Sequence, residues 1–180
     1  LLRMGLAGVV VFCLFLPGWI AKGAALLVFA AASVTDWLDG LLARRLKQES
    51  DLGALLDPIA DRVLVLGTLA ALALIGLFPM WMAVVILIRD VLVTGTRLIA
   101  VRESVVLSAA REGKHKTVWQ MAALIGGLIL LALREMPSGL DPSVDAWLFK
   151  AVMAALWIAL ILTVVSGISF FWRQRRMFNQ

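Results

Sequence analysis

Charged side chains and cysteine are scarce in this sequence. Asp, Glu, Lys and Arg make up 16% of the 180 residues, and the single cysteine is Cys13. One cysteine excludes an intrachain disulfide and any metal site built from several thiolates. The sequence also lacks internal repeats, low-complexity tracts and linkers long enough to separate domains. We therefore expect a single domain over residues 1–180.

Apolar residues are abundant where charged residues are scarce. They form 62% of the chain, and the mean hydropathy is +0.97. A water-soluble domain of this size cannot bury so much apolar surface, because the buried fraction rises only slowly with chain length. The first apolar run, Met4 to Ala21, is followed by further apolar segments, which argues against a cleavable signal peptide. We expect a membrane protein.

The apolar segments have the length of bilayer-spanning helices. Such a helix needs about 20 mainly apolar residues at 1.5 Å each. Short polar breaks, several of them containing Pro and Gly, divide the sequence into segments of that size. The pattern predicts an all-α integral membrane protein with six transmembrane helices, near residues 1–16, 20–46, 51–77, 80–104, 115–134 and 144–172.

Lys and Arg residues are distributed unevenly around these segments. Most lie at the second-to-third and fourth-to-fifth connections and after the sixth segment, whereas the opposite side of the predicted membrane offers only Lys22, Arg134 and Lys150. Because basic residues that flank spans stay in the cytoplasm, we expect a multi-pass protein of the cytoplasmic (inner) membrane, with both chain ends and the basic connections inside. The net charge of +5 suits anionic headgroups or phosphorylated substrates better than nucleic acid.

Four aspartates lie inside the predicted second and third helices, where one carboxylate costs about 2.5–3.5 kcal/mol. Asp36 and Asp39 are spaced i, i+3, and Asp57 and Asp61 are spaced i, i+4, so each pair shares a helix face. Consecutive helices are expected to be antiparallel neighbours, which lets all four carboxylates converge below the cytoplasmic surface. Oxygen ligands without nitrogen or sulfur suit Mg²⁺ or Mn²⁺. The sequence predicts a divalent metal site.

Other interpretations of these residues are open at this point. A lone intramembrane aspartate can serve a helix–helix hydrogen bond or pair with an arginine, and small residues such as Gly40 and Gly53 occur in ordinary helix packing. A cation or proton transporter could use the carboxylates as its ion site, although such sites usually lie at the bilayer midplane between repeated halves. His115 lies in a basic run, so we interpret it as a solvated loop residue rather than a general base.

The aspartates belong to a longer pattern. It reads Asp36-Trp37-Leu38-Asp39-Gly40-Leu41-Leu42-Ala43-Arg44, eight residues, Gly53, three residues, Asp57, three residues, Asp61. The pattern resembles the signature of the CDP-alcohol phosphatidyltransferases and matches it at all eight fixed positions. The resemblance implies a six-helix membrane enzyme, usually a homodimer, that transfers a phosphatidyl group from CDP-diacylglycerol to an alcohol and releases CMP.

The resemblance also implies a role for each signature residue. The four aspartates would hold two divalent ions on the CDP diphosphate. Asp57 and Asp61 would be the catalytic pair, with Asp61 as the base for the attacking hydroxyl. The cytidine and its phosphates would be surrounded by Asp39, Gly40, Ala43, Arg44 and Gly53. Phosphoryl-type transfer is mostly positioning and charge neutralisation, which agrees with this assignment.

The acceptor is inferred from basic residues in the fourth helix and at the start of the fifth. Several cations at one depth suit an acceptor that carries its own phosphate, and the candidates are Arg89, Arg97, Lys114 and Lys116. Within the family the chain is most similar to members that use sn-glycerol 3-phosphate. Inositol phosphate, another polar alcohol and phosphatidylglycerol are alternative acceptors, and cytoplasmic charge bias is an alternative reason for the cations.

Two segments depart from the pattern of those members. Asp90 stands where they usually have Glu after the arginine. The segment Ser166-Gly167-Ile168-Ser169-Phe170 lacks their usual aromatic residue before the phenylalanine. Both departures bear on the acceptor rather than on the phosphatidyl transfer.

Overall fold

The computed structural model describes the backbone of residues 2–46, 51–102 and 113–175, and the side chains of residues 4–35, 62–96, 116–170 and 172. All regular structure in these ranges is α-helical, as predicted. Each helix boundary lies within three residues of its predicted position. The helices are α1 (Leu2–Phe15), α2 (Trp19–Leu46), α3 (Asp51–Leu74), α4 (Met80–Arg102), α5 (Gly113–Arg134) and α6 (Pro142–Arg175).

The end of α3 differs from the prediction because Gly76 closes the helix early. Its φ of +87° is a left-handed conformation that a side chain would strain. The Gly76 amide donates to the Ala73 carbonyl and the Leu77 amide donates to the Leu72 carbonyl, each at 3.0 Å. These two bonds form a Schellman cap. The helix therefore ends at Leu74 and the chain turns directly into α4.

The start of α6 also differs, because Asp141 caps it. The Asp141 carboxylate accepts a hydrogen bond from the Ser143 amide at 2.8 Å and another from the Ser143 hydroxyl at 2.5 Å. Both bonds favour the charged form, so they lower the pKa of Asp141. Pro142 then occupies the first helical position, where its missing N–H is no loss. The helix begins two residues before the predicted position.

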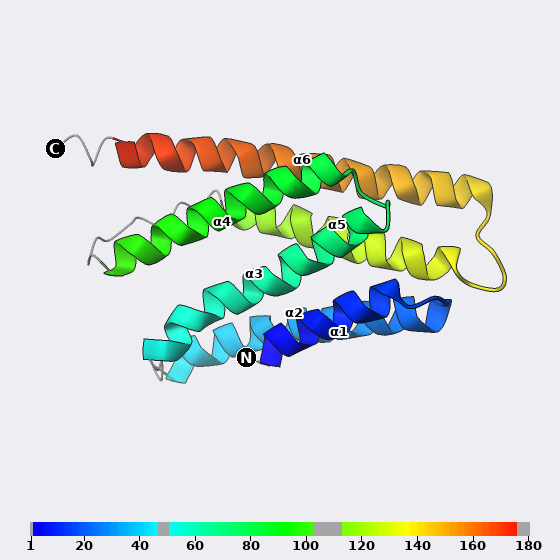
Figure 1. The fold of residues 1–180 in the computed structure, drawn as a ribbon, viewed down its shortest axis with the longest axis horizontal. Helices are drawn as coiled ribbons and strands as arrows, with labels where there is room; N and C mark the ends of the chain where they lie inside the picture. The colour runs from blue at the N-terminus through cyan, green and yellow to red at the C-terminus, as the bar shows by residue number, and fades with distance from the viewer. Residues whose placement is uncertain (1, 47–50, 103–112, 176–180) are drawn as a thin grey trace.

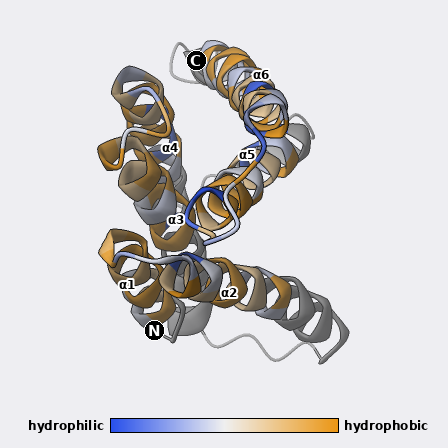
Figure 2. Ribbon diagram, turned by 90° about the vertical axis from the view of Figure 1, so that its right-hand side faces the viewer, coloured by the Kyte–Doolittle hydropathy of each residue, from blue (hydrophilic) through white to orange (hydrophobic). Residues whose placement is uncertain are grey.

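The six helices form three antiparallel pairs (Figures 1 and 2). The most extensive contact is between α5 and α6, and α1 packs against both α2 and α3. In addition, α5 contacts α2 and α3, while α4 contacts α3 and α6. The helices α2 and α3 run antiparallel as predicted (Figure 1), but in the part that the structure describes they pack against α1 and α5 more than against each other.

A glutamate and a lysine join the α1–α2 turn to the end of α5. The buried Lys22 ammonium donates to the carbonyls of Leu14, at 2.5 Å, and Leu16, at 2.8 Å. The Glu135 carboxylate accepts from the Gly18 amide at 2.6 Å and lies 3.4 Å from the Lys22 nitrogen. A cation beside the last carbonyls of α1 also suits the helix dipole. These contacts hold two turns together at one end of the molecule.

Apolar side chains fill the interior and also cover much of the outside. Leu14, Phe29, Leu72 and Leu156 are fully buried, whereas Leu27 is 71% exposed. Large exposed apolar side chains lie on every helix whose side chains are described. An apolar exterior of this extent is expected where lipid is the solvent.

Two helical segments in the described chain are long and apolar enough to cross a membrane, namely 116–134 in α5 and 142–170 in α6. Shorter apolar segments are Met4–Phe15, Trp19–Thr35 and Arg62–Leu74. The helix ends that flank the two basic connections lie at the same end of the molecule as the end of α6, in the arrangement that the predicted orientation requires (Figure 1). The prediction of six spans goes beyond these segments.

Candidate active site

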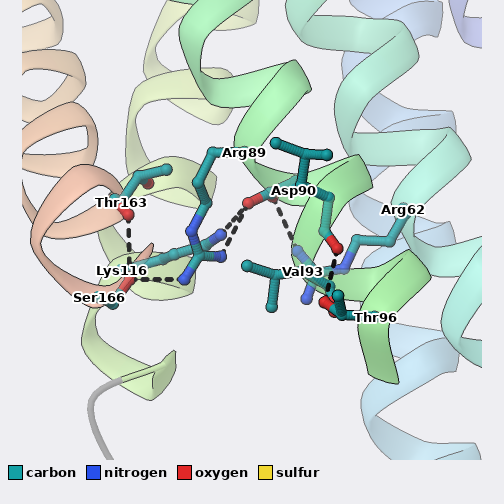
Figure 3. A network of polar contacts seen from close by, with 9 residues as sticks. Arg62, Arg89, Asp90, Val93, Thr96, Lys116, Thr163 and Ser166 are labelled. Carbon is teal, nitrogen blue, oxygen red and sulfur yellow. Dashed lines mark hydrogen bonds and ion pairs between the residues drawn. The ribbon is translucent and has the colours of Figure 1, made fainter. Parts of the chain in front are cut away.

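A buried carboxylate in α4 gathers cations from three helices (Figure 3). Asp90 accepts a hydrogen bond at 2.8 Å from Arg62 Nη1 of α3 and one at 3.1 Å from Arg89 Nη1 of its own helix. The Lys116 ammonium of α5 bonds to the same oxygen as Arg89. The Asp90 side chain is 0% exposed and that of Lys116 only 2%, against 15% for Arg89 and 31% for Arg62. We call these four residues the Asp90 cluster.

The helix arrangement explains how the cluster forms. Because α4 packs against α3 and α6, Asp90 and Arg62 lie on facing helices. Lys116 lies in the first turns of α5, and α5 is not among the helices that α4 contacts extensively in the described chain. Its long, flexible side chain spans the remaining gap to Asp90. The ion pairs of the Asp90 cluster therefore connect α3, α4 and α5 within the apolar interior.

A second layer of polar groups surrounds Arg89. Arg89 Nη2 donates to the Ser166 hydroxyl of α6 at 2.8 Å, and that hydroxyl donates to the Thr163 carbonyl at 3.2 Å. Within the described chain, Arg89 Nε and Gln120 Nε2 are buried donors with no hydrogen-bond partner. A buried polar atom without a partner costs free energy, so these two donors can gain stability from a further hydrogen-bond acceptor.

The charges of the Asp90 cluster do not cancel. Three cations surround one carboxylate, which leaves two positive charges. No other acidic side chain in the described ranges pairs with these cations. Excess buried charge is costly because the desolvation penalty is repaid only by an opposite charge. The exposed edges of Arg62 and Arg89 are therefore a favourable place for an anion such as phosphate, which binds arginine through charge-assisted hydrogen bonds.

An apolar cavity of about 770 Å³ adjoins the cluster. It lies between α4 and α6, and Arg89 is the one charged residue of its lining. The remaining lining residues are Val85, Ile88, Leu92, Val164, Gly167, Ile168 and Trp172. Arg89 thus has polar partners on one side and an apolar cavity on the other.

The predicted metal and nucleotide residues lie on the two expected helices. The second half of α2 carries Asp36, Asp39, Gly40, Ala43 and Arg44, and the first half of α3 carries Gly53, Asp57 and Asp61. Both backbones are helical there, so the spacings put each aspartate pair on one helix face. The side chains lie outside the described ranges, and the described ones contain no group of three or more potential metal ligands. The metal site stays a prediction.

The four predicted acceptor residues fall into two groups. Arg89 and Lys116 meet at Asp90, as a common site requires. The side chains of Arg97 and Lys114 lie outside the described ranges. Arg62 and Asp90 stand out in the sequence as ionisable residues within predicted spans, and Asp90 and the Ser166–Phe170 segment as departures from the pattern of related enzymes, but sequence reasoning assigned no contact at this site to Asp90, Arg62 or Ser166. That signal marks them as functional candidates, but their partners come from other helices.

Comparisons with known proteins agree with the signature. The sequence model of the CDP-alcohol phosphatidyltransferase family matches residues 1–165. A CDP-diacylglycerol--glycerol-3-phosphate 3-phosphatidyltransferase of Bacillus subtilis is 38% identical over 152 residues, which cover 84% of this chain and 74% of the relative. A probable phosphatidylglycerophosphate synthase of Mycobacterium tuberculosis is 36% identical over 179 residues, covering 98% and 79%.

A plant relative extends the similarity. The CDP-diacylglycerol--glycerol-3-phosphate 3-phosphatidyltransferase 2 of Arabidopsis thaliana is 31% identical over 185 residues, covering 88% of this chain and 78% of the relative. The family match extends through α1 to α5 and over most of α6, and so includes both the aspartate signature and the Asp90 cluster. The chain belongs to the CDP-alcohol phosphatidyltransferase family.

Proposed function

We propose that the protein transfers the phosphatidyl group of CDP-diacylglycerol to sn-glycerol 3-phosphate, forming phosphatidylglycerophosphate and CMP. The names of the bacterial and plant relatives support this reaction for a chain that aligns with them over most of its length. The observation that carries the choice of acceptor is the excess of two positive charges in the Asp90 cluster, counted over its described residues. A phosphorylated alcohol would supply the missing negative charge, whereas an uncharged alcohol would not.

The exposed fractions suggest different roles within the cluster. Arg62 and Arg89 are partly exposed, so their free N–H groups would contact the acceptor phosphate. Lys116 is buried against Asp90, so it would act mainly by neutralising that carboxylate and holding it in place. Arg97 and Lys114 stay predicted members of the same site.

The acceptor site lies next to the predicted reaction centre along the chain. Asp61 directly precedes Arg62 on α3, so their Cα atoms are about 3.8 Å apart. Asp57 is one helical turn earlier. The proposed acceptor residue Arg62 and the predicted catalytic aspartates therefore lie within two turns of the same helix.

The donor set of the signature fits hard divalent ions. Asp36, Asp39, Asp57 and Asp61 offer only carboxylate oxygens, which suit Mg²⁺ or Mn²⁺. We propose that these residues hold two such ions. When bound, the ions would neutralise the diphosphate and the developing charge on the entering and leaving oxygens.

The proposed displacement conserves atoms and charge. The free primary hydroxyl oxygen of glycerol 3-phosphate forms a bond to the phosphorus of the phosphatidyl group. The bond between that phosphorus and the oxygen bridging to the cytidine phosphate breaks, and CMP leaves with this oxygen. Asp61 takes the hydroxyl proton as attack proceeds. Asp39, Gly40, Ala43, Arg44 and Gly53 would hold the cytidine and its phosphates.

We further propose a multi-pass arrangement with six spans in the cytoplasmic (inner) membrane and the active site facing the cytoplasm. The basic connections and the end of α6 share one end of the molecule (Figure 1), which is the distribution expected for the cytoplasmic side. A homodimer is the expected assembly within the family. The exposed apolar surfaces of the helices leave room for lipid and for a second copy.

The test is an acceptor panel with purified protein in detergent micelles containing CDP-diacylglycerol and Mg²⁺ or Mn²⁺. CMP release is measured with glycerol 3-phosphate, glycerol, inositol phosphate and phosphatidylglycerol. We expect release with glycerol 3-phosphate and only background release with glycerol, which lacks the phosphate. Release with another acceptor and none with glycerol 3-phosphate would contradict the proposed function.

A further inference from the structure

We propose that Ser166 and Gly167 of α6 are positioning residues that set the Arg89 guanidinium for the acceptor phosphate. This inference rests on the proposed function and extends it to a helix that carries none of the signature aspartates. It also gives a role to the segment in which the sequence departs from the family pattern.

Gly167 allows α6 to approach the Arg89 side chain closely. A Cβ atom built on Gly167 would lie 3.1 Å from Arg89 Cγ and 3.2 Å from Arg89 Nε. These distances are shorter than ordinary van der Waals contacts, so the arginine would have to move by a few tenths of an ångström. By contrast, a Cβ on Gly95 of α4 would meet nothing within 4 Å. Close fits also occur at Gly126 and Gly127, but there the nearest atoms belong to apolar side chains, whereas at Gly167 they belong to Arg89.

Ser166 fixes the other end of the same side chain. Its hydroxyl donates its one proton to the Thr163 carbonyl at 3.2 Å, so a lone pair is left to accept from Arg89 Nη2 at 2.8 Å. Ser166 is itself buried, with 8% of its surface exposed. The direction of this hydrogen bond is therefore set by the backbone of α6.

Together these contacts leave the guanidinium little freedom. Asp90 holds Nη1 and Ser166 holds Nη2, while Nε lies under Gly167 without a hydrogen-bond partner among the described residues. Arginine has five N–H donors in a rigid plane. Nη1 and Nη2, which donate to Asp90 and Ser166, each keep one further N–H group. The guanidinium plane also sets the direction in which these two N–H groups point. A displaced side chain would lose an anchor or turn these donors away from the phosphate.

The central test is Gly167→Ala, assayed for CMP release with both substrates varied. We expect the KM for glycerol 3-phosphate to rise about fivefold, with kcat and the KM for CDP-diacylglycerol changed less than about twofold, because acceptor binding is weakened selectively. Gly126→Ala is the matched control. Its Cβ would lie 2.9 Å from Val152 Cγ2, at an α5–α6 contact away from the cluster. It should lower the unfolding temperature (Tm) and leave both KM values unchanged.

A double-mutant cycle separates positioning from a general effect on folding. An Arg89→Lys background keeps the Cγ atom that the added methyl would meet, but it replaces the rigid guanidinium plane by an ammonium whose donors rotate freely. With no plane to misdirect, Gly167→Ala should then add less than about twofold to the acceptor KM. Ser166→Ala should raise the acceptor KM like Gly167→Ala, and Ser166→Thr, which keeps the hydroxyl, should restore it. This pair tests the proposal even if an alanine at Gly167 prevents folding.

Three results would overturn the proposal. They are an equal rise of both KM values in Gly167→Ala, the same acceptor effect in Gly126→Ala, and a full effect of Gly167→Ala in the Arg89→Lys background. Failure of the proposed function is distinguishable, because wild-type protein would then release CMP with a different acceptor. The same variants would be assayed with that acceptor, and an unchanged KM there would overturn the positioning role.

Discussion

Replacing Asp90 by Asn tests whether the buried cluster is held together by charge. The substitution keeps the size of the side chain and removes the only negative charge among the described residues of the cluster. Removing one partner of a buried ion pair costs about 3–5 kcal/mol, because the other charge stays buried without compensation. Lys116, with 2% of its side chain exposed, is the cation most affected.

Thermal unfolding in detergent, followed by tryptophan fluorescence, measures this loss. For a chain of this length a loss of that size corresponds to a fall in Tm of roughly 10 °C. Asp145→Asn is the matched control, because Asp145 forms a bidentate pair with Arg134 at the protein surface. Exposed ion pairs contribute little to stability, so we expect a much smaller change in Tm.

A second substitution tests whether the unpaired Lys116 ammonium causes the loss of stability in Asp90→Asn. Adding Lys116→Met to Asp90→Asn removes the buried ammonium and fills its space with an apolar chain of similar length. Replacing both members of a buried pair by groups of similar volume is often neutral, so the double variant should regain more than half of the lost Tm. If Asp90→Asn changes Tm no more than Asp145→Asn does, or if Lys116→Met restores nothing, the electrostatic reasoning is refuted.

Other predictions concern the reaction centre and the helix ends. Chelation by EDTA should abolish CMP release by the wild type, and added Mn²⁺ should restore it. The Asp57→Asn variant should stay inactive at the Mn²⁺ concentration that saturates the wild type. CMP release in the presence of EDTA would contradict the metal assignment. Asp61→Asn should lower kcat about 10²–10⁴-fold, as expected for loss of a general base, while CDP-diacylglycerol binding persists; unchanged turnover would refute its role. Glu135→Gln should reduce the free energy of unfolding by about 1 kcal/mol through its weakened hydrogen bond and leave kcat unchanged, which unfolding and CMP-release assays check. Gly76→Ala should cost about 1–2 kcal/mol because its φ is positive, again with unchanged kcat, and an unaltered Tm would contradict this.

Much of the fold was predictable because local signals mark the helices. Runs of apolar residues interrupted by Pro, Gly and charged breaks place all six helices to within three residues. The remaining differences are of one to three residues, and two of them, at the end of α3 and the start of α6, lie where Gly76 and Asp141 form caps whose hydrogen bonds depend on backbone conformation. The pairing of helices was less predictable. The helices α2 and α3 are consecutive and antiparallel, yet α1 packs against both of them.

In the candidate site, too, spacing within one helix was predictable from the sequence, whereas contacts between helices were not. The spacing of Asp36, Asp39, Asp57 and Asp61 is a property of the sequence, because a helix converts fixed intervals into a shared face. Arg89 and Lys116 were predicted from their basic character and expected depth, and the structure brings them to one carboxylate. That this carboxylate is Asp90 was not predicted, since residues from separate helices meet only after packing.

The sequence by itself determined that the protein is suited to a lipid environment, where its helices lie, which family it belongs to and which charged residues lie within the apolar helices. Composition and local spacing give these properties because they are independent of how the helices pack. Only the tertiary structure decided which charges meet. Three cations on α3, α4 and α5 share Asp90, and the Ser166–Gly167 segment of α6 closes on Arg89. Such contacts depend on the distance between helix axes, and no spacing within a single helix encodes that distance.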